Sequence, residues 1–318
     1  MLSNSPDDFM PLDPQAQNLL QQLALLELPP LSTLTPAQAR QLRAKFRGRG
    51  LRPQTVPRVE NRTIPGSEGT IPVRLYTPQG SPPFPVLVYF HGGGWVLGDL
   101  DAADSTCRSL ANGAGCVVVS VDYRLAPEHK FPAALDDAYA ATQWVAAHAT
   151  ALNGDARRIA VAGDSAGGNL AAAVALMARD KGSPALAYQL LIYPVTQYRF
   201  DTESYREYGQ GGFGLTKDEM VWFWHHYLPR DADGGNPYAS PLLAHDLSHL
   251  PPALMVTAEC DVLRDEAEAY AKRLQAAGVS VQLQRYEGMI HDFVGMAVVL
   301  DRGKEALAQM ATYLQNQN

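Results

Sequence analysis

The sequence predicts an α/β fold in which a mostly parallel central sheet is flanked by helices and carries a helical cap. The main observation is a series of short, almost wholly apolar runs separated by helical segments, which is typical of parallel strands that are buried on both faces. Residues 56–65 and 70–78 alternate in polarity instead, and this predicts further strands before the series. The apolar runs are residues 85–90, 116–123, 158–163, 188–194, 253–260 and 281–288.

Two regions outside this alternation predict the cap. Leucines at helical spacing in residues 15–28 predict one helix, and a start at Thr35 and Pro36 predicts a second helix that reaches Gly48. About 58 aromatic-rich residues separate the fourth and fifth apolar runs, which is too long for a loop and predicts a helical insertion. We expect these regions to pack together as a lid; the alternative is that they only cover the core surface. The expected division has four parts. Residues 1–55 form the N-terminal part of the cap and residues 56–195 the first part of the catalytic core. Residues 196–240 form the cap insertion and residues 241–318 the second part of the core.

Composition and charge argue against several classes of protein. The 318 residues carry a net charge of −7, which gives no reason to expect nucleic acid as a partner. No window approaches the roughly 18 consecutive apolar residues that a membrane span needs. The first ten residues contain Asp7 and Asp8 but no basic residue, whereas a signal peptide begins with a positively charged segment. We therefore expect no signal peptide and a cytoplasmic location. The three cysteines lack metal-ligand spacing, and we expect free buried thiols and no metal.

The candidate nucleophile is Ser165, at the centre of the Gly-Asp-Ser-Ala-Gly segment 163–167. An apolar strand precedes this segment and a helix follows it, so the serine is expected on a sharp strand-to-helix turn. Such a turn strains the backbone, and it needs small neighbours that do not collide with the strand or the helix. The motif alone occurs by chance, but the strand and helix around it make the prediction specific.

A serine hydroxyl needs a base, and the base needs an acid that orients it. Of the five histidines after Ser165, only His291 follows a later strand, and it is the expected base. Asp261 directly follows the apolar run that ends at residue 260, where a parallel sheet places its active site. Asp265 and Asp292 are the alternatives for the acid, and we favour Asp261 over both.

Oxyanion donors are expected from a glycine loop and from the residue after the nucleophile. Glycines 92–94 follow the strand at 85–90, and glycines let backbone N–H groups face a ligand without obstruction. We assign the donors to Gly93, Gly94 and Ala166. A glycine run could instead hold a phosphate, but the lysine-containing phosphate-loop pattern is absent. The segment 123–132 is expected to form a buried turn that supports this loop.

Several motifs together resemble one known family. His-Gly-Gly-Gly-Trp at 91–95, the serine motif, the segments 122–137 and 261–266, and His-Asp-Phe at 291–293 look like the hormone-sensitive-lipase-like family of carboxylesterases. The resemblance spans the whole chain and implies an α/β-hydrolase fold with a cap, activity on small-molecule esters with short to medium acyl chains, no cofactor, and homodimerisation through the last strand. Cys260 and Val262, on either side of the expected acid, depart from the family pattern.

Residues that contact the substrate are harder to assign from sequence. Trp95 either lines the pocket or packs, and Asp164 is expected to accept local hydrogen bonds beside the substrate. Tyr193, Phe213 and Leu215 are expected pocket walls. The adjacent histidines at 225–226 fit a lid helix better than a metal site, because neighbouring residues on a helix point in different directions. The rival functions are a ligand receptor without catalysis, a peptidase or amidase, and a lipase acting at an oil–water interface.

Overall fold

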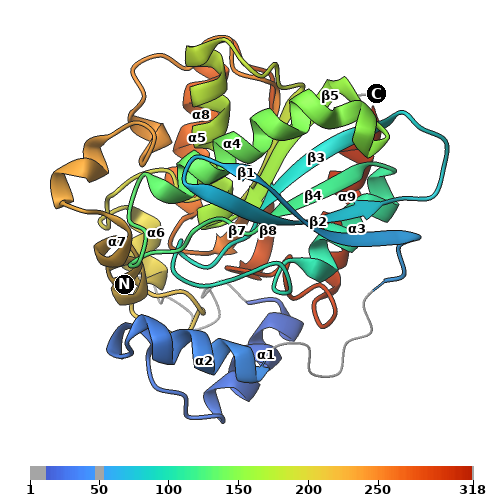
Figure 1. Ribbon diagram of the computed structural model, residues 1–318. Coiled ribbons are helices and arrows are strands. Elements are labelled where there is room, and N and C mark those ends of the chain that lie inside the picture. The colour runs from blue at the N-terminus through green and yellow to red at the C-terminus, as the bar shows by residue number, and fades with distance from the viewer. Residues whose placement is uncertain (1–11, 47–53, 317–318) are drawn as a thin grey trace, which may run out of the picture.

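The structure is a computed structural model that describes residues 12–46 and 54–316, and it contains one eight-stranded sheet (Figure 1). The strand order is β1-β2-β4-β3-β5-β6-β7-β8. The β1–β2 and β2–β4 pairs are antiparallel and all other pairs are parallel, which confirms the predicted mostly parallel sheet. The strands are β1 Arg58–Gly66, β2 Gly69–Thr77, β3 Phe84–Phe90, β4 Val117–Val121, β5 Gly154–Asp164, β6 Tyr188–Ile192, β7 Ala253–Cys260 and β8 Val281–Ile290.

Helices cover both faces of the sheet because the central strands are apolar on both sides. Val88 and Phe90 of β3 belong to one buried cluster, whereas Leu87 and Tyr89 belong to a second cluster on the opposite face. Helices α4, α5 and α8 contribute to the first cluster, and α3 and α9 contribute to the second (Figure 1). These helices are α3 Asp104–Ala114, α4 Ala133–His148, α5 Ala166–Lys181, α8 Arg264–Ala276 and α9 Asp301–Asn316.

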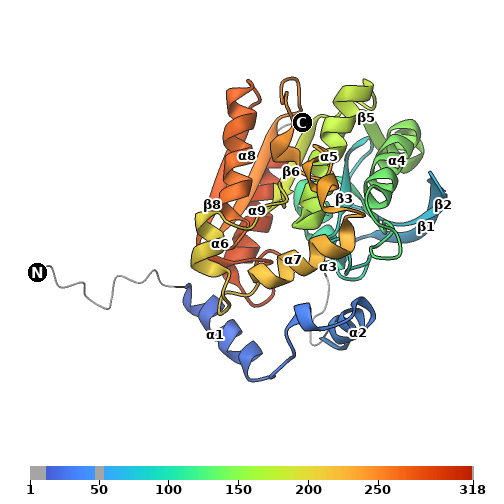
Figure 2. The ribbon, with the colours of Figure 1, turned by 90° about the vertical axis from the view of Figure 1, so that its left-hand side faces the viewer.

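The N-terminal helices lie beside the helices of the 196–240 segment (Figure 2). The indole Nε1 of Trp222 donates to the carbonyl of Leu34 at 3.1 Å, which joins the two regions directly. Reciprocal hydrogen bonds between Thr35 and Gln38 begin α2, and the pair Thr216 and Glu219 begins α7 in the same way. The helices are α1 Pro14–Ala24, α2 Pro36–Phe46, α6 Glu203–Tyr208 and α7 Lys217–Tyr227. Whether they move as a lid, and where the cap meets the core, stay predictions.

One helix end differs from the sequence-based expectation, and a second lies outside the described residues. The first helix was expected to continue to residue 28, but it ends at Ala24, and the side chain of Leu25 is 81% exposed. Leu26 and Leu28 are also largely exposed, at 47% and 40%, so little burial favours extending the helix through them. The second helix is described as far as Phe46, and its expected end at Gly48 lies outside the described residues. Within residues 12–46 and 54–316, every helix is too short or too polar to traverse a bilayer.

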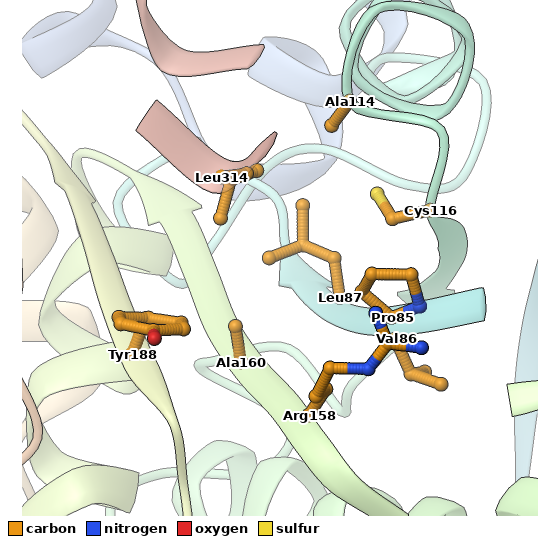
Figure 3. A pocket seen from close by; sticks show the side chains of 9 residues that line it. All are labelled: Pro85, Val86, Leu87, Ala114, Cys116, Arg158, Ala160, Tyr188 and Leu314. Atoms are coloured by element: carbon orange, nitrogen blue, oxygen red, sulfur yellow. The ribbon is translucent and has the colours of Figure 1, made fainter. Parts of the chain in front are cut away.

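A small cavity lies at the amino-terminal ends of the parallel strands (Figure 3). Cys116, Tyr188 and Leu314 are among its lining side chains, and its volume is only ≈ 10 Å³. This is about the space of a single water molecule, so the cavity does not offer a ligand site. All three cysteines are buried free thiols, as predicted.

Candidate active site

Ser165 lies on the turn between β5 and α5 and has strained backbone angles. Its φ of 56° and ψ of −118° are rare for a residue with a side chain. The turn is tight enough that a Cβ atom at Gly167 would overlap with the carbonyl oxygen of Phe90. The Ser165 N–H donates to the carbonyl of Ile192 at 2.8 Å, which fixes the turn to β6. The small residues of the motif therefore allow the tight strand-to-helix turn that the sequence predicted.

A continuous hydrogen-bond chain joins the three residues expected to form the triad. The distance between Ser165 Oγ and His291 Nε2 is 3.0 Å, and His291 Nδ1 lies 2.7 Å from Asp261 Oδ2. Asp261 is 1% exposed, and its other oxygen accepts the N–H of Leu263 at 3.0 Å. The carboxylate is thus held on both oxygens, even though Val262 departs from the family pattern at the next position.

The alternative acids lie elsewhere. Asp265 is in the first turn of α8, where it accepts from the N–H of Ser204 at 2.8 Å and pairs with Arg264. Asp292 follows the histidine with a φ of 65° and lines the pocket described below. Neither forms a hydrogen bond to His291 among the described residues, whereas Asp261 does.

Burial and the neighbouring carboxylates act in opposite directions on the pKa of His291. Burial alone lowers the pKa of His291, because the charged imidazolium loses its solvent. The charge and hydrogen bond of Asp261, together with the charges of Asp292 and Asp164, oppose this effect, and the pKa of His291 is raised above its ordinary value. A histidine in this setting accepts a proton readily while its orientation is fixed by the aspartate.

Two glycines of the predicted oxyanion loop line the same pocket as Ser165. Gly93 and Gly94 have φ values of +115° and +60°, conformations that glycine adopts without strain. Ala166 is the first residue of α5, so its N–H is one of those without an intrahelical partner. The three predicted donors therefore come from two elements, the glycine loop after β3 and the first residue of α5.

Side chains from three other segments hold this loop in place. The Gly92 N–H donates to Asp164 Oδ1 at 3.1 Å, and the hydroxyl of Tyr89 donates to the same oxygen at 2.7 Å. From the other side, the Tyr123 hydroxyl donates to the carbonyl of His91 at 2.7 Å, so the segment after β4 supports the loop as expected. Burial raises the pKa of Asp164 to about 6, and the charge of Asp292 adds to the rise.

Replacing Gly94 with alanine is expected to impair the loop. A Cβ atom at this position would overlap with the ring of Phe223 in α7, and the backbone would also have to hold a side chain at positive φ. We expect Gly94→Ala to lower kcat for ester hydrolysis by about 10²–10³-fold, the loss typical of a missing oxyanion donor. The measurement is steady-state hydrolysis of p-nitrophenyl acetate.

The control for this experiment is Gly115→Ala. Gly115 ends α3 with nearly the same φ, +61°, but a Cβ atom there would meet nothing within 4 Å. We expect this variant to lose only about 1–2 kcal/mol in free energy of unfolding and to keep the parental kcat. A Gly94→Ala protein as active as the Gly115→Ala protein would show that the loop does not supply the donors.

The serine opens into a pocket of ≈ 850 Å³. Asp164, Tyr193 and Leu215 line it, as expected from the sequence, and the Tyr193 ring lies 4.8 Å from the His291 ring, centroid to centroid. The volume is ample for a small-molecule substrate. The pocket also receives side chains that sequence reasoning did not single out, namely Arg43, Val195, Met220, Phe223 and Val294.

Of the residues considered for the pocket, Trp95 takes the packing alternative and Phe213 lies outside the lining. Trp95 is 0% exposed and does not line the pocket; its ring stacks on Tyr227 at 4.1 Å. The bulky indole follows the glycines and packs on Trp224 and Tyr227 of α7, where its burial is favourable. Phe213 contacts the ring of Tyr208 at 5.0 Å and also lies outside the pocket lining. Met220 and Phe223, three residues apart on one face of α7, take that place.

Two histidines and a cysteine that the sequence analysis considered form no part of the hydrogen-bond chain. His225 and His226 are in the last turn of α7, so they lie on a helix as expected. Cys260 is buried beside the acid. In the part of the chain that the structure describes, no group of three or more His, Cys, Asp or Glu side chains could hold a metal ion.

Fold and hydrogen-bond chain together define the class of protein. Enzymes of the α/β-hydrolase fold carry their serine on a strained strand-to-helix turn, and the acid and the histidine follow later in the chain at strand ends. Ser165, Asp261 and His291 have this order and this placement. The chain is therefore a serine hydrolase of the α/β-hydrolase fold.

Comparison with known proteins gives the family. The chain belongs to the alpha/beta hydrolase fold family, whose model matches residues 87–295. Carboxylic ester hydrolase LipN of Mycobacterium tuberculosis is 48% identical over 77% of this chain and 66% of its own length. Carboxylesterase NlhH of the same species is 46% identical over 83% and 85% of the two chains. The solved hyperthermophilic esterase of Pyrobaculum calidifontis is 47% identical, with a TM-score of 0.90 over 96% and 99% of the chains. These relatives confirm the predicted relationship to carboxylesterases.

Proposed function

We propose that this protein is a carboxylesterase that hydrolyses esters with short to medium acyl chains through an acyl-enzyme on Ser165. The observation that carries the proposal is the unbroken hydrogen-bond chain from Ser165 through His291 to Asp261, which opens into the pocket beside the glycine loop. The names of the relatives agree with this chemistry.

Acylation begins when Ser165 Oγ attacks the carbonyl carbon of the ester. His291 Nε2, 3.0 Å away, takes the hydroxyl proton, and the Asp261 carboxylate stabilises the resulting imidazolium. The carbonyl oxygen becomes an oxyanion that the N–H groups of Gly93, Gly94 and Ala166 stabilise. When the tetrahedral intermediate collapses, His291 donates its proton to the leaving alkoxide, and the alcohol departs.

Deacylation repeats these steps with water as the nucleophile. Water adds to the acyl carbon as His291 removes one of its protons, and the same donors hold the new oxyanion. Collapse returns the proton to Ser165 Oγ and releases the carboxylic acid. Atoms and charges balance with the ester, one water molecule and the chain's own residues.

The pocket supports the assignment of the substrate class. Its ≈ 850 Å³ suits a small ester, and Leu215, Met220 and Phe223 give it an apolar wall on the cap side. An amide would need the same triad, but an alkoxide is the easier leaving group, which favours ester over amide hydrolysis. A receptor without catalysis would have no use for a histidine oriented between the serine and the aspartate.

Assembly and location complete the proposal. A homodimer through β8 is supported by the place of this strand at the edge of the sheet, where only β7 pairs with it among the described strands. A cytoplasmic location is supported by three buried free thiols, which persist in a reducing compartment.

Hydrolysis of p-nitrophenyl esters from acetate to palmitate tests the substrate class. We expect kcat/KM to be greatest between acetate and octanoate and to decline for longer chains, because the pocket has a finite volume. A maximum at palmitate, with activation by an oil–water interface, would instead identify a lipase. A protein that is inactive on the whole series would contradict the proposal.

A further inference from the structure

Glu266 is a buried carboxyl group that the proposed mechanism does not use. It lies in the first turn of α8, five residues after Asp261, and is 1% exposed. Among the described residues it forms no ion pair with a cation. A buried carboxyl group without a cation is unfavourable unless hydrogen bonds compensate it, so its partners indicate what it does.

The partners of Glu266 are backbone groups at the start of the 196–240 segment. Its Oε1 accepts from the N–H of Thr196 at 2.6 Å and from the N–H of Gln197 at 3.2 Å. The Thr196 carbonyl in turn accepts the N–H of Leu242 at 2.9 Å. Glu266 therefore holds the point at which the chain leaves the core for the insertion and comes back from it.

A second contact joins the same two segments. The Ser204 hydroxyl donates to the carbonyl of Val262 at 2.7 Å, and the Ser204 N–H donates to Asp265 at 2.8 Å. Residues 196–204 are thus attached at both ends to the turn 261–266. This turn also carries Asp261, whose position sets the orientation of His291.

We propose that Glu266 is a positioning residue. It fixes residues 196–197, where the insertion begins, to the turn that carries Asp261, and so keeps the cap-side wall of the pocket in its position relative to the triad. The proposal rests on the esterase function proposed above. Leu215, Met220 and Phe223, which line the pocket, all lie in the insertion that Glu266 holds. Displacement of the insertion therefore changes the acyl site, and displacement of the turn changes the triad.

The protonation of Glu266 suggests the variants to compare. Burial raises the pKa of Glu266 to about 8 against the hydrogen bonds of Thr196 and Gln197, and the charge of Asp261 adds to the rise. At neutral pH the group is largely protonated, so glutamine is its closest match. Glutamine keeps an oxygen that accepts the two N–H groups, whereas alanine removes it.

The test compares Glu266→Ala and Glu266→Gln in the full-length protein. Kinetics with p-nitrophenyl acetate and hexanoate are normalised to the active fraction, which is titrated with a p-nitrophenyl phosphonate that binds covalently to Ser165. We expect Glu266→Ala to lower kcat by about tenfold and to raise KM for hexanoate more than KM for acetate, because small displacements of catalytic groups have large effects on rate. Glu266→Gln is expected to restore both values to within about threefold of the parent.

Glu268 provides the matched control, because it is a second carboxylate of α8 that touches neither segment. It is 8% exposed and pairs with Arg285 at 2.6 Å. Glu268→Ala is expected to lower the thermal midpoint and to leave normalised kcat and KM unchanged. If Glu266→Ala behaves in the same way, Glu266 is only a structural residue and the proposal is overturned. It is also overturned if Glu266→Gln is as impaired as Glu266→Ala.

Ser204→Ala decides the question if Glu266→Ala does not fold. It removes the hydroxyl contact to Val262 while the peptide N–H contact to Asp265 remains. We expect the same rise in KM for hexanoate over acetate, and parental kinetics would overturn the proposal. A failure of the esterase function is distinguishable, because the parent protein itself would then hydrolyse none of the esters.

Discussion

Ser165→Ala is expected to lower kcat for p-nitrophenyl esters by about 10⁴–10⁶-fold, the range found when a serine nucleophile is removed from a triad. Alanine keeps the backbone turn between β5 and α5 and removes only the oxygen that would form the acyl-enzyme. His291 then has no hydroxyl to deprotonate, although it stays paired with Asp261. Stopped assays with parent and variant at equal concentrations measure the loss directly.

The control for Ser165→Ala is a second triad variant and the double variant. His291→Ala should lose nearly as much activity, and Ser165→Ala/His291→Ala should lose no more than the worse of the two, because triad members act as a unit. Multiplied losses in the double variant would mean that the two residues act independently. Unchanged hydrolysis by Ser165→Ala would exclude the acyl-enzyme on this serine.

The triad was predictable because each member has a local signal. Ser165 lies in a motif whose small residues and flanking elements are all visible in the sequence. Asp261 and His291 follow apolar runs, and the carboxyl ends of parallel strands meet at one edge of a sheet. The structure brings the three together with no change in assignment.

The pocket walls were less predictable because they depend on contacts between distant segments. Trp95 directly follows the glycine loop, yet its side chain packs on Tyr227 from the insertion, and no local pattern indicates that contact. Met220 and Phe223 reach the pocket because of where α7 lies in the fold. Thr216 caps the start of this helix, but the sequence does not show which side of it faces the pocket. The tether at Glu266 has the same origin, since its partners are 69 and 70 residues away in the sequence.

Asp261→Asn is the substitution that tests the acid, and we expect it to lower kcat/KM by about 10⁴-fold. The carboxylate accepts a hydrogen bond from Nδ1–H of His291, which leaves Nε2 unprotonated and able to accept the Ser165 proton. An asparagine that presents its NH₂ group to Nδ1 favours the other tautomer, in which Nε2 carries the proton and cannot act as a base. Asp265→Asn and Asp292→Asn change the two alternative acids. Each variant should retain roughly a hundredfold more activity than Asp261→Asn, because neither residue forms a hydrogen bond to His291 among the described residues.

The pH dependence of the same variant gives an independent result with a defined sign. Only neutral His291 can act as a base, so activity falls as the pH drops through its pKa. In the parent, Asp261 raises the pKa of His291 above its ordinary value of about 6.5, which places the acid limb of kcat/KM above that pH. Asp261→Asn removes the largest of the effects that raise the pKa of His291. Burial, which lowers this pKa, is then opposed only by the weaker effects of Asp292 and Asp164, so the acid limb of the residual activity moves to lower pH. Profiles recorded at the isosbestic wavelength of p-nitrophenol measure both limbs. A limb that stays in place in Asp261→Asn but moves in Asp292→Asn would transfer the role of the acid to Asp292.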